Sequence, residues 1–269
     1  MMVKTDLHTH TLFCDGNDSP EEMVLSAIER GFEAIGFSGH SYTAIDESYC
    51  MSLDGTRQYV EEIAALKEKY KGKIKIFCGI EQDYHSAPPR EEFDYIIGSV
   101  HYVEFDGKYF AVDEDSETTQ FIVNKYCGGD FDTLAERYFE NVGEVLTKTN
   151  ADIIGHFDLV SKFNEVLGIK TSERYLNAAK SAVKKLVAFD KPFEINVGAM
   201  TRGYRTSPYP SEDILKVIYR LGGKIIISGD CHNKDNLGDC FEDAYRMAKK
   251  CGFTEAFYLT QEGFKSYKL

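Results

Sequence analysis

The stretch Val3-Lys4-Thr5-Asp6-Leu7-His8-Thr9-His10 decides how this 269-residue chain is interpreted. It reads as a short strand that runs out into a loop, and Asp15 follows just beyond it. Side chains alternate between the two faces of a strand, so His8 and His10 point the same way and both imidazoles can reach one ion. A chance pair of surface histidines would explain this stretch alone, so the rest of the chain must distinguish the two readings.

The composition is that of a globular protein with enough apolar surface for an extensive core. Hydrophobic residues make up 43% of the chain and charged residues 28%. Acidic residues outnumber basic ones by 44 to 31, which gives a formal net charge of −13. Such a field repels polyanions, so we expect no nucleic-acid partner. A small anionic substrate is still compatible with this charge, because a metal cluster can reverse its sign locally.

Cellular location is predicted from three further features. The chain does not open with a basic segment followed by an apolar run, so we expect no signal peptide. No apolar run is long enough to predict a membrane span. The seven cysteines are scattered and include no C-x-x-C pair, which is a poor framework for disulfides or a zinc finger. We therefore expect reduced thiols in a cytoplasmic protein without a membrane partner; nothing in the pattern predicts an oligomeric state.

Short β-type runs alternate with longer amphipathic stretches, and no linker, repeat or low-complexity tract divides the chain. A single domain over residues 1–269 is therefore predicted. The predicted strands are Val3–Leu7, Ala34–Phe37, Ile74–Cys78, Tyr95–Val100, Asp152–Ile154, Phe193–Ile195, Ile225–Ile227 and Ala256–Leu259. The predicted helices are Pro20–Gly31 with Ser19 as its cap, Thr56–Tyr70, Asp132–Thr147, Ser172–Phe189, Ser211–Leu221 and Asp239–Lys250.

About seven strand–helix repeats in regular alternation favour a parallel sheet. With this many units we predict an α/β protein whose sheet forms a distorted, TIM-like (β/α)7 barrel, closed or nearly closed. No G-x-G-x-x-G motif follows the first strand, so a dinucleotide-binding fold lacks its signature. The acidic, glycine-containing span at about residues 104–130 breaks the alternation. We expect it to form an excursion over one face, where it either shapes access to a substrate site or has no such role.

Side chains that bind metals follow the predicted strands, at the end where a β/α barrel builds its active site. Six of the seven histidines lie at such strand ends, and His85 is the exception. In chain order the strands lead into His8, His10 and Asp15, then His40, Glu81, His101, His156, and finally Asp230 with His232. The sixth strand, which ends in Glu194-Ile195-Asn196, is taken to offer no ligand. Convergence of these groups predicts a metal site that holds more than one ion.

Taken one at a time, several of these residues have an ordinary structural explanation. His40 alone is also explained as a capping residue, and His156 as a core histidine bonded to the backbone. Glu81 alone is also explained as a surface carboxylate. Asp15 lies in a Cys-Asp-Gly-Asn turn, where an Asx turn accounts for it without any metal.

As a set, the motifs resemble the polymerase-and-histidinol-phosphatase (PHP) superfamily over nearly the whole chain. The resemblance is carried by Asp6-Leu7-His8-Thr9-His10, Gly36-Phe37-Ser38-Gly39-His40, Gly79-Ile80-Glu81, Gly98-Ser99-Val100-His101, Gly155-His156-Phe157-Asp158 and Ser228-Gly229-Asp230-Cys231-His232. Two further blocks are similar to the histidinol-phosphatase branch: Glu194-Ile195-Asn196 with Tyr209-Pro210-Ser211, and His156-Phe157-Asp158-Leu159.

The resemblance implies a site for three divalent metal ions, for which zinc, manganese and iron are all suitable. One ion would be held by His8, His10, Glu81 and Asp230. A second would share Glu81 and add His101 and His156, and a third would use Asp15, His40 and His232. Many relatives have a histidine where this chain has Asp15, so the third site is the least defined.

The favoured function is a phosphomonoesterase that hydrolyses L-histidinol phosphate to L-histidinol and phosphate in histidine biosynthesis. A hydroxide that bridges two ions would attack phosphorus in line. Asp230, His232 or a metal-bound water would protonate the departing alkoxide. The alternatives are another phosphoesterase of the superfamily, acting on phosphotyrosine, nucleotides or phosphodiesters, and a metal-holding barrel without activity. Net negative charge counts against nucleic acid, and the full set of candidate ligands counts against lost activity.

Contacts to the substrate are predicted less directly. Arginine suits phosphate recognition because its guanidinium presents a fork of donors. The candidates for the phosphate are Arg202, Arg205 and Lys162, each of which is otherwise a solvated surface charge. The candidates for the histidinol moiety are Tyr102, Glu104 and Phe157.

Overall fold

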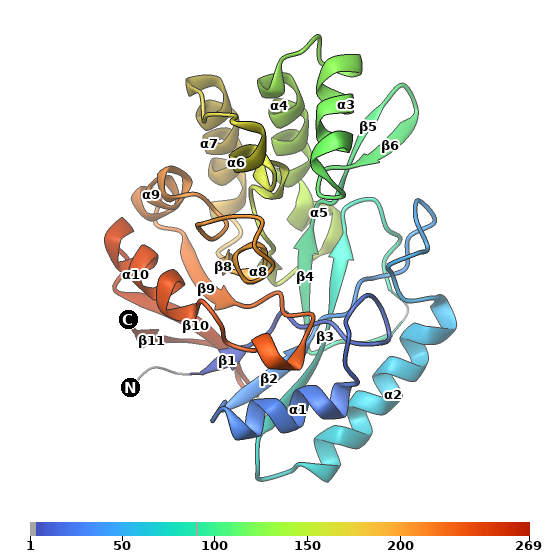
Figure 1. Cartoon of the computed structure of the whole chain (residues 1–269). Helices are drawn as coiled ribbons and strands as arrows, with labels where there is room; N and C mark the ends of the chain where they lie inside the picture. Colours follow the sequence, from blue (N-terminus) through green and yellow to red (C-terminus); the bar gives the residue numbers. More distant parts are fainter. Residues whose placement is uncertain (1–3, 90) are drawn as a thin grey trace.

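The computed structural model describes residues 4–89 and 91–269 (Figure 1). Within them a curled sheet runs in the order β1-β2-β3-β4-β7-β8-β9-β10-β11. Neighbouring strands from β1 to β10 pair in parallel, and β11 pairs antiparallel with β10. The strands of this sheet are β1 (Thr5–Asp6), β2 (Ala34–Phe37), β3 (Lys75–Asp83), β4 (Tyr95–Ser99), β7 (Ile153–Ile154), β8 (Pro192–Asn196), β9 (Lys224–Ser228), β10 (Glu255–Thr260) and β11 (Gly263–Lys268).

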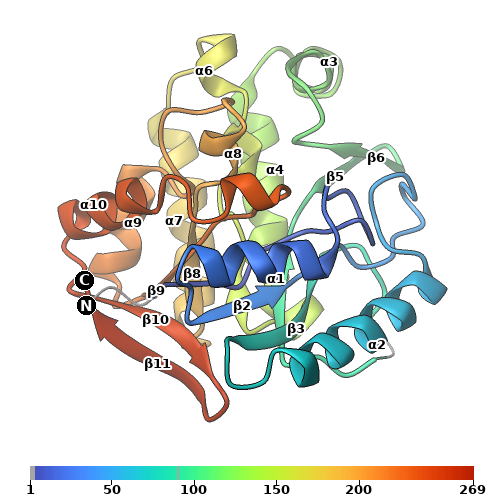
Figure 2. The same ribbon diagram turned by 60° about the horizontal axis from the view of Figure 1, so that its bottom comes forward.

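The curled sheet closes where the chain leaves β1 and β9. Thr9 and Cys231 form a parallel bridge there. The amide of His10 donates to the carbonyl of Cys231 at 2.9 Å, and the amide of Cys231 donates to the carbonyl of His8 at 3.0 Å. On the other side of β9, the β10–β11 hairpin continues the sheet instead of closing it (Figure 2). The result is a distorted TIM-like β/α barrel in a single domain, which confirms the predicted fold class.

Helices cover the outer face of the sheet (Figure 1). They are α1 (Pro20–Glu29), α2 (Leu53–Lys69), α4 (Phe131–Val142), α5 (Val145–Thr149), α7 (Glu173–Val187), α9 (Glu212–Arg220) and α10 (Phe241–Cys251). The start of α1 follows from its sequence: the Ser19 hydroxyl accepts from the amide of Glu22 at 3.3 Å, and the Glu22 carboxylate accepts from the amide of Ser19 at 3.0 Å. This reciprocal capping box satisfies backbone donors that a helix start otherwise leaves unpaired. The Ser52 and Ser172 side chains cap α2 and α7 without a reciprocal partner, by accepting from the amides of Gly55 and Tyr175.

The interior of the barrel is filled by side chains from most of its strands. These are Leu7, Ala34, Phe77, Tyr95, Ile97, Ile153, Ile226 and Leu259. Tyr95 crosses this interior, and its hydroxyl donates to the carbonyls of Leu7 at 2.5 Å and Phe37 at 3.0 Å. Glycine is needed beside it, because a Cβ on Gly79 would lie only 2.3 Å from the Tyr95 ring. The packed interior leaves the mouth of the barrel as the place for a polar site.

Several predicted boundaries need correction. The first strand was predicted from Val3, which lies outside the described residues. The third strand does not end at Cys78: it pairs with β4 as far as Asp83, so Glu81 lies inside the strand rather than after it. The predicted helix Asp132–Thr147 is two helices, because α4 ends at Gly143 and α5 begins afresh.

The excursion at about residues 104–130 contains regular structure that the sequence analysis left out. A hairpin of β5 (Tyr102–Phe105) and β6 (Lys108–Ala111) is followed by α3 (Ser116–Tyr126). The signal for the hairpin is the Asp106-Gly107 pair, in which both residues have positive φ, 52° and 71°. An Asp-Gly pair is typical of a tight hairpin turn, because both of its residues tolerate positive φ. The terminal strand β11 was missed as well.

Four short elements complete the fold: the 3₁₀ turns η1 (Leu159–Ser161) and η2 (Lys234–Asn236), and the helices α6 (Asn164–Leu167) and α8 (Gly198–Thr201). Within residues 4–89 and 91–269, no helix has both the length and the hydropathy that a bilayer crossing requires.

Candidate metal centre

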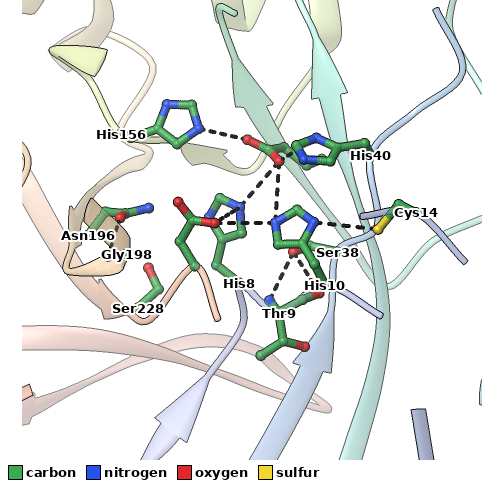
Figure 3. A network of polar contacts seen from close by, with 12 residues as sticks. His8, Thr9, His10, Cys14, Ser38, His40, His156, Asn196, Gly198 and Ser228 are labelled. Atoms are coloured by element: carbon green, nitrogen blue, oxygen red, sulfur yellow. Dashed lines mark hydrogen bonds and ion pairs between the residues drawn. The ribbon is translucent and has the colours of Figure 1, made fainter. Parts of the chain in front are cut away.

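The carboxyl ends of the parallel strands meet around one cavity of about 190 Å³. Its lining consists mainly of polar side chains from distant parts of the chain: Asp15, His40, Glu81, His101, Asp113, His156, Leu159, Lys162, Arg202, Tyr204, Asp230 and His232. His8 and His10 lie buried directly beneath, and Figure 3 shows their rings near those of His40 and His156. All nine residues predicted as metal ligands are therefore gathered at one end of the barrel.

Glu81 is the centre of this arrangement. Its Oε1 lies 2.8 Å from Nε2 of His156 and 3.4 Å from Nε2 of His101. Its Oε2 lies 2.9 Å from Nδ1 of His40 and 3.3 Å from Nε2 of His8. Burial by itself would raise the pKa of Glu81, but the surrounding imidazoles hold that pKa well below its usual range. From its position inside β3, this carboxylate contacts four imidazoles.

In the part of the chain that the structure describes, four overlapping groups of ligand atoms are spaced closely enough to hold ions, with all atoms of a group within 4.8 Å of one another. The groups are His8–His10–Asp230, His8–Glu81–His156, His40–Glu81–His101 and His10–Asp15–His40–His232. These groups differ from the ligand sets that the family resemblance implies. The resemblance places His101 and His156 on the same ion, whereas the spacing of the ligand atoms groups His101 with His40 and His156 with His8. The overlap indicates more than one metal site in the same pocket.

Unpaired buried atoms test whether these residues suit a metal. Nε2 of His8, Nε2 of His10 and Oε2 of Glu81 are buried and make no hydrogen bond of suitable geometry within residues 4–89 and 91–269, although Oε2 lies 2.9 Å from Nδ1 of His40 and 3.3 Å from Nε2 of His8. Leaving such atoms unpaired in a protein interior is costly, and ligation of a cation removes the cost. Imidazole nitrogen with carboxylate oxygen is a donor set suited to zinc, manganese or iron. The residues therefore fit divalent ions.

Glu194 is a residue of the site that the sequence analysis missed. Its Oε1 lies 2.6 Å from Nδ1 of His8 and accepts from the Ser228 hydroxyl at 2.5 Å. Its Oε2 accepts from the amide of His156 at 2.9 Å and from the Asn196 side chain at 2.9 Å. The sixth predicted strand therefore does supply an ionisable group, which orients ligands without lying among them. A glutamate in the middle of an apolar strand was the available signal.

Asp83 has the same role for a second histidine and was also missed. Its Oδ2 accepts from the amide of His101 at 3.0 Å and lies 3.1 Å from Nδ1 of the same residue. Burial opposes a charged imidazole, but Glu81 and Asp83 together raise the pKa of His101 to about 10. Carboxylates that hold the far nitrogen of a ligand histidine fix its orientation and tautomer.

Asp15 lies at the more exposed edge of the cluster. Its Oδ2 lies 3.2 Å from Nε2 of His232, and its Oδ1 lies 3.6 Å from both Nδ1 of His10 and Nε2 of His40. The Cys14 thiol lies 3.6 Å from Nδ1 of His10, as Figure 3 shows. Asp15 therefore faces three imidazoles, which an Asx turn alone would not require.

Of the lysine and arginine side chains in residues 4–89 and 91–269, Arg202 and Lys162 line the cavity. The Arg202 guanidinium donates to Oδ2 of Asp230 at 3.2 Å and lies 2.7 Å from Nδ1 of His232. Burial works against the charge on Asp230, but Arg202 and His8 hold the pKa of Asp230 well below its usual range. The Lys162 ammonium donates to the carbonyl of Asp113 at 2.7 Å.

Other candidates lie elsewhere. Arg205 does not line the cavity, because its guanidinium donates to the Ser161 hydroxyl at 2.5 Å and stacks 4.4 Å from the centre of the Tyr209 ring. Nor do the three residues proposed for histidinol, Tyr102, Glu104 and Phe157, belong to its lining. Phe157 in particular packs in the core against Phe139 and Phe193.

The chain is similar to known proteins over most of its length. The PHP domain family matches the chain over residues 6–197. Histidinol-phosphatase of Bacillus subtilis is 24% identical over 90% of this chain and 98% of its own length. Histidinol-phosphatase of Lactococcus lactis is 28% identical over 94% of this chain and 93% of its own.

The crystal structure of histidinol phosphate phosphatase from Lactococcus lactis, complexed with zinc, L-histidinol and phosphate, has a similar fold. It superposes with a TM-score of 0.72 at 24% identity and covers 98% of this chain and 99% of its own. The family match extends over more than half of the chain and includes seven of the nine predicted ligands, from His8 to His156. The chain therefore belongs to the PHP domain family of metal-dependent phosphoesterases.

Proposed function

We propose that this protein hydrolyses L-histidinol phosphate to L-histidinol and inorganic phosphate. The observation that carries the proposal is one cavity in which clustered imidazoles and carboxylates face the cations Arg202 and Lys162. A phosphate dianion needs concentrated positive charge and forked hydrogen-bond donors, and this cavity provides both once ions are bound. The cavity is small, which favours a compact monoester over a polymer. The histidinol-phosphatase relatives, aligned over nearly the full chain, support this choice of substrate.

In this proposal the ligands are divided as the family resemblance implies. His8, His10, Glu81 and Asp230 would hold one ion, Glu81, His101 and His156 a second, and Asp15, His40 and His232 a third. The spacing of the ligand atoms also allows His101 to share an ion with His40, and His156 with His8. When bound, such ions supply a nucleophile derived from water near neutral pH and positive charge for the phosphoryl oxygens. Zinc, manganese and iron all suit these donors.

The side chains of the protein then have separate tasks. Arg202 swings its fork of donors onto the phosphate oxygens, and Lys162 contributes a second positive charge. Glu194 and Asp83 keep His8 and His101 in the orientation and tautomer that ligation requires. The oxygen of water bonds to phosphorus, the bond from phosphorus to the ester oxygen breaks, and the departing alkoxide takes a proton to become L-histidinol.

The charges around Asp230 argue against this residue as the donor of that proton. Because its pKa is held well below the usual range, Asp230 is ionised at neutral pH and is a poor proton donor. His232 lies closer to solvent on the rim of the cavity. We therefore assign charge stabilisation to Asp230. His232 donates the proton only while no ion occupies the third site; with that ion bound, the proton comes from solvent.

Steady-state hydrolysis of L-histidinol phosphate, tyrosine phosphate and a dinucleotide by the purified protein tests the proposal. We expect turnover of L-histidinol phosphate to exceed that of the others by at least about tenfold, because only this ester matches the proposed pocket. Activity should be lost on chelation and return when a divalent ion is added. Comparable or faster cleavage of the dinucleotide would contradict the proposed substrate while leaving the family membership unchanged.

A further inference from the structure

Asp113 is a carboxylate in the cavity wall with no role in the proposed metal centre. Four carboxylates line the cavity: Asp15, Glu81, Asp113 and Asp230. Three of them belong to the groups of ligand atoms described above, and Asp113 belongs to none. A negative charge that faces a phosphate site without binding a metal works against phosphate binding, so it needs another explanation.

The backbone holds Asp113 firmly at this position. It follows the β5–β6 hairpin, and the amide of the preceding Val112 donates to the carbonyl of His101 at 2.9 Å. Lys162 donates from its ammonium to the backbone carbonyl of Asp113 at 2.7 Å. Asp113 is therefore held at the cavity through two residues: His101, which follows β4, and Lys162, which follows η1. Both hydrogen bonds are accepted by backbone carbonyls, so neither involves the Asp113 carboxylate.

The carboxylate retains charge and exposure. The Lys162 ammonium lies 3.5 Å from its Oδ2, and the Asp113 side chain keeps 26% of its surface exposed. Within residues 4–89 and 91–269, Lys162 is the cation paired with this carboxylate. Burial would raise the pKa of Asp113, but Lys162 and the nearby imidazoles hold that pKa below its usual value. Asp113 is therefore anionic at neutral pH and open to the cavity.

The wall beside Asp113 already holds one cation, the ammonium of Lys162. The Lys162 ammonium lies 5.0 Å from the centre of the Tyr204 ring, and the face of an aromatic ring attracts positive charge. Tyr204 is 40% exposed and lines the same cavity. Carboxylate and ring face together form a surface that suits a protonated amine better than a neutral alcohol.

The chemistry of the substrate places such an amine close to phosphate. In L-histidinol phosphate the ammonium is carried by the carbon next to the one that bears the ester oxygen. With the phosphate held at the ligand cluster, the ammonium remains within the same small cavity. We propose that Asp113 binds this ammonium, so that the enzyme selects phosphomonoesters whose alcohol carries a neighbouring protonated amine. This inference rests on the proposed function and adds a specificity-determining residue to it.

The test uses the metal-loaded protein and two esters, L-histidinol phosphate and its deamino analogue 3-(imidazol-4-yl)propyl phosphate. We expect Asp113→Asn to lower kcat/KM for L-histidinol phosphate by about 10- to 100-fold, mostly through KM, as loss of a charged hydrogen bond does. For the deamino analogue, kcat/KM should fall by less than about threefold in the same variant, because this ester has no ammonium for Asp113 to bind. Asp113→Glu should recover part of the preference.

Asp106→Asn is the matched control, since it makes the same chemical change on the exposed turn of the same hairpin. Asp106→Asn should leave kcat/KM for both esters unchanged. Equal losses on both esters in Asp113→Asn would overturn the inference, because they would assign Asp113 to the fold or to Lys162.

Turnover of both esters by the wild-type protein separates failure of this inference from failure of the proposed function. A wild-type enzyme that hydrolyses both esters without preferring the amine also overturns the inference, whether or not the variants fold. A wild-type enzyme that hydrolyses neither ester refutes the proposed function itself. Calorimetry with L-histidinol and 3-(imidazol-4-yl)propanol gives a readout independent of turnover. L-Histidinol should bind to Asp113→Asn at least about tenfold more weakly than to the wild type, whereas the affinity for 3-(imidazol-4-yl)propanol should be unchanged.

Discussion

Nδ1 of His8 lies 2.6 Å from Oε1 of Glu194, and both side chains are fully buried although 186 residues separate them. An ionised carboxylate at this distance requires a proton on Nδ1, so the lone pair of a neutral imidazole is left on Nε2. That nitrogen faces Glu81 at 3.3 Å, inside the ligand cluster. Glu194 thereby decides which nitrogen of His8 is offered to an ion.

Glu194→Gln should weaken metal binding by about 10- to 100-fold, the range typical for loss of a carboxylate behind a ligand histidine. The amide keeps the size of the side chain but loses the charge that fixes the tautomer of His8. Competition with a chromophoric chelator measures the effect. The matched control is Glu47→Gln on an exposed loop, which should bind metal as the wild type does. Equal affinity in both variants would contradict the assigned role.

Metal binding should release protons and weaken as the pH falls. His101 has a pKa of about 10 in the metal-free protein because Glu81 and Asp83 stabilise its charged form. A ligand imidazole must be neutral, so an ion that binds near pH 7.5 displaces the proton of His101. Calorimetry in buffers of different ionisation enthalpy counts the released protons. His85→Gln, which changes the one histidine outside the cluster, should give the wild-type count.

Without metal, the same ion pairs make stability depend on pH in the opposite sense. The pKa of His101 is raised above its ordinary value of 6.5 on folding. Its stabilisation is therefore complete below about pH 6.5 and is lost as the pH rises through about 10. We expect the chelated protein to unfold at lower denaturant concentration at pH 10 than at pH 6.5. An unchanged midpoint would show that His101 is not charged in the metal-free fold.

Arg202→Met and Arg205→Met should differ in their effects although the two residues are close in sequence. Arg202 lines the cavity, so its loss should weaken inhibition by inorganic phosphate by about tenfold or more. Arg205 is held by Ser161 and Tyr209 outside the cavity, so its loss should lower the melting temperature with less than about threefold change in phosphate affinity. Product-inhibition constants and thermal unfolding of both variants make the comparison. The opposite pattern would reassign the phosphate contact to Arg205.

Asp6→Asn should flatten the pH dependence of stability between about pH 4 and pH 7. Burial raises the pKa of Asp6 to about 7 from an ordinary value of 3.8, although the amides of Gly229 and His8 donate to its Oδ1. A raised pKa on folding means that the contribution of Asp6 is complete below about pH 3.8 and is lost as the pH rises through about 7.

Asparagine keeps an oxygen for both amides and has no charge to bury. Relative to wild type, the variant should therefore gain about 2–4 kcal/mol between pH 4 and pH 8, as a shift of this size implies. Urea unfolding of the chelated proteins at both pH values measures the gain. A constant difference between the two proteins would contradict a raised pKa.

The sequence by itself determined the class of fold and the positions of the nine candidate ligands. Both depend on local patterns: apolar strands alternate with capped helices, and histidines or carboxylates come where strands end. In a parallel barrel all strand ends meet at one mouth, so local position is enough to predict convergence. The same reasoning failed at Glu81, because only pairing with β4 extends β3 far enough to place that carboxylate inside the strand.

Only the tertiary structure decided which groups stand behind the ligands and which line the cavity. Glu194 reaches His8 across the barrel, Asp83 reaches His101, and Asp113 arrives on a hairpin from outside the barrel. Arg202 and Arg205, almost adjacent in sequence, face different surroundings. Such contacts join residues far apart along the chain, and their geometry depends on how strands are paired and curled, which no local pattern of residues contains.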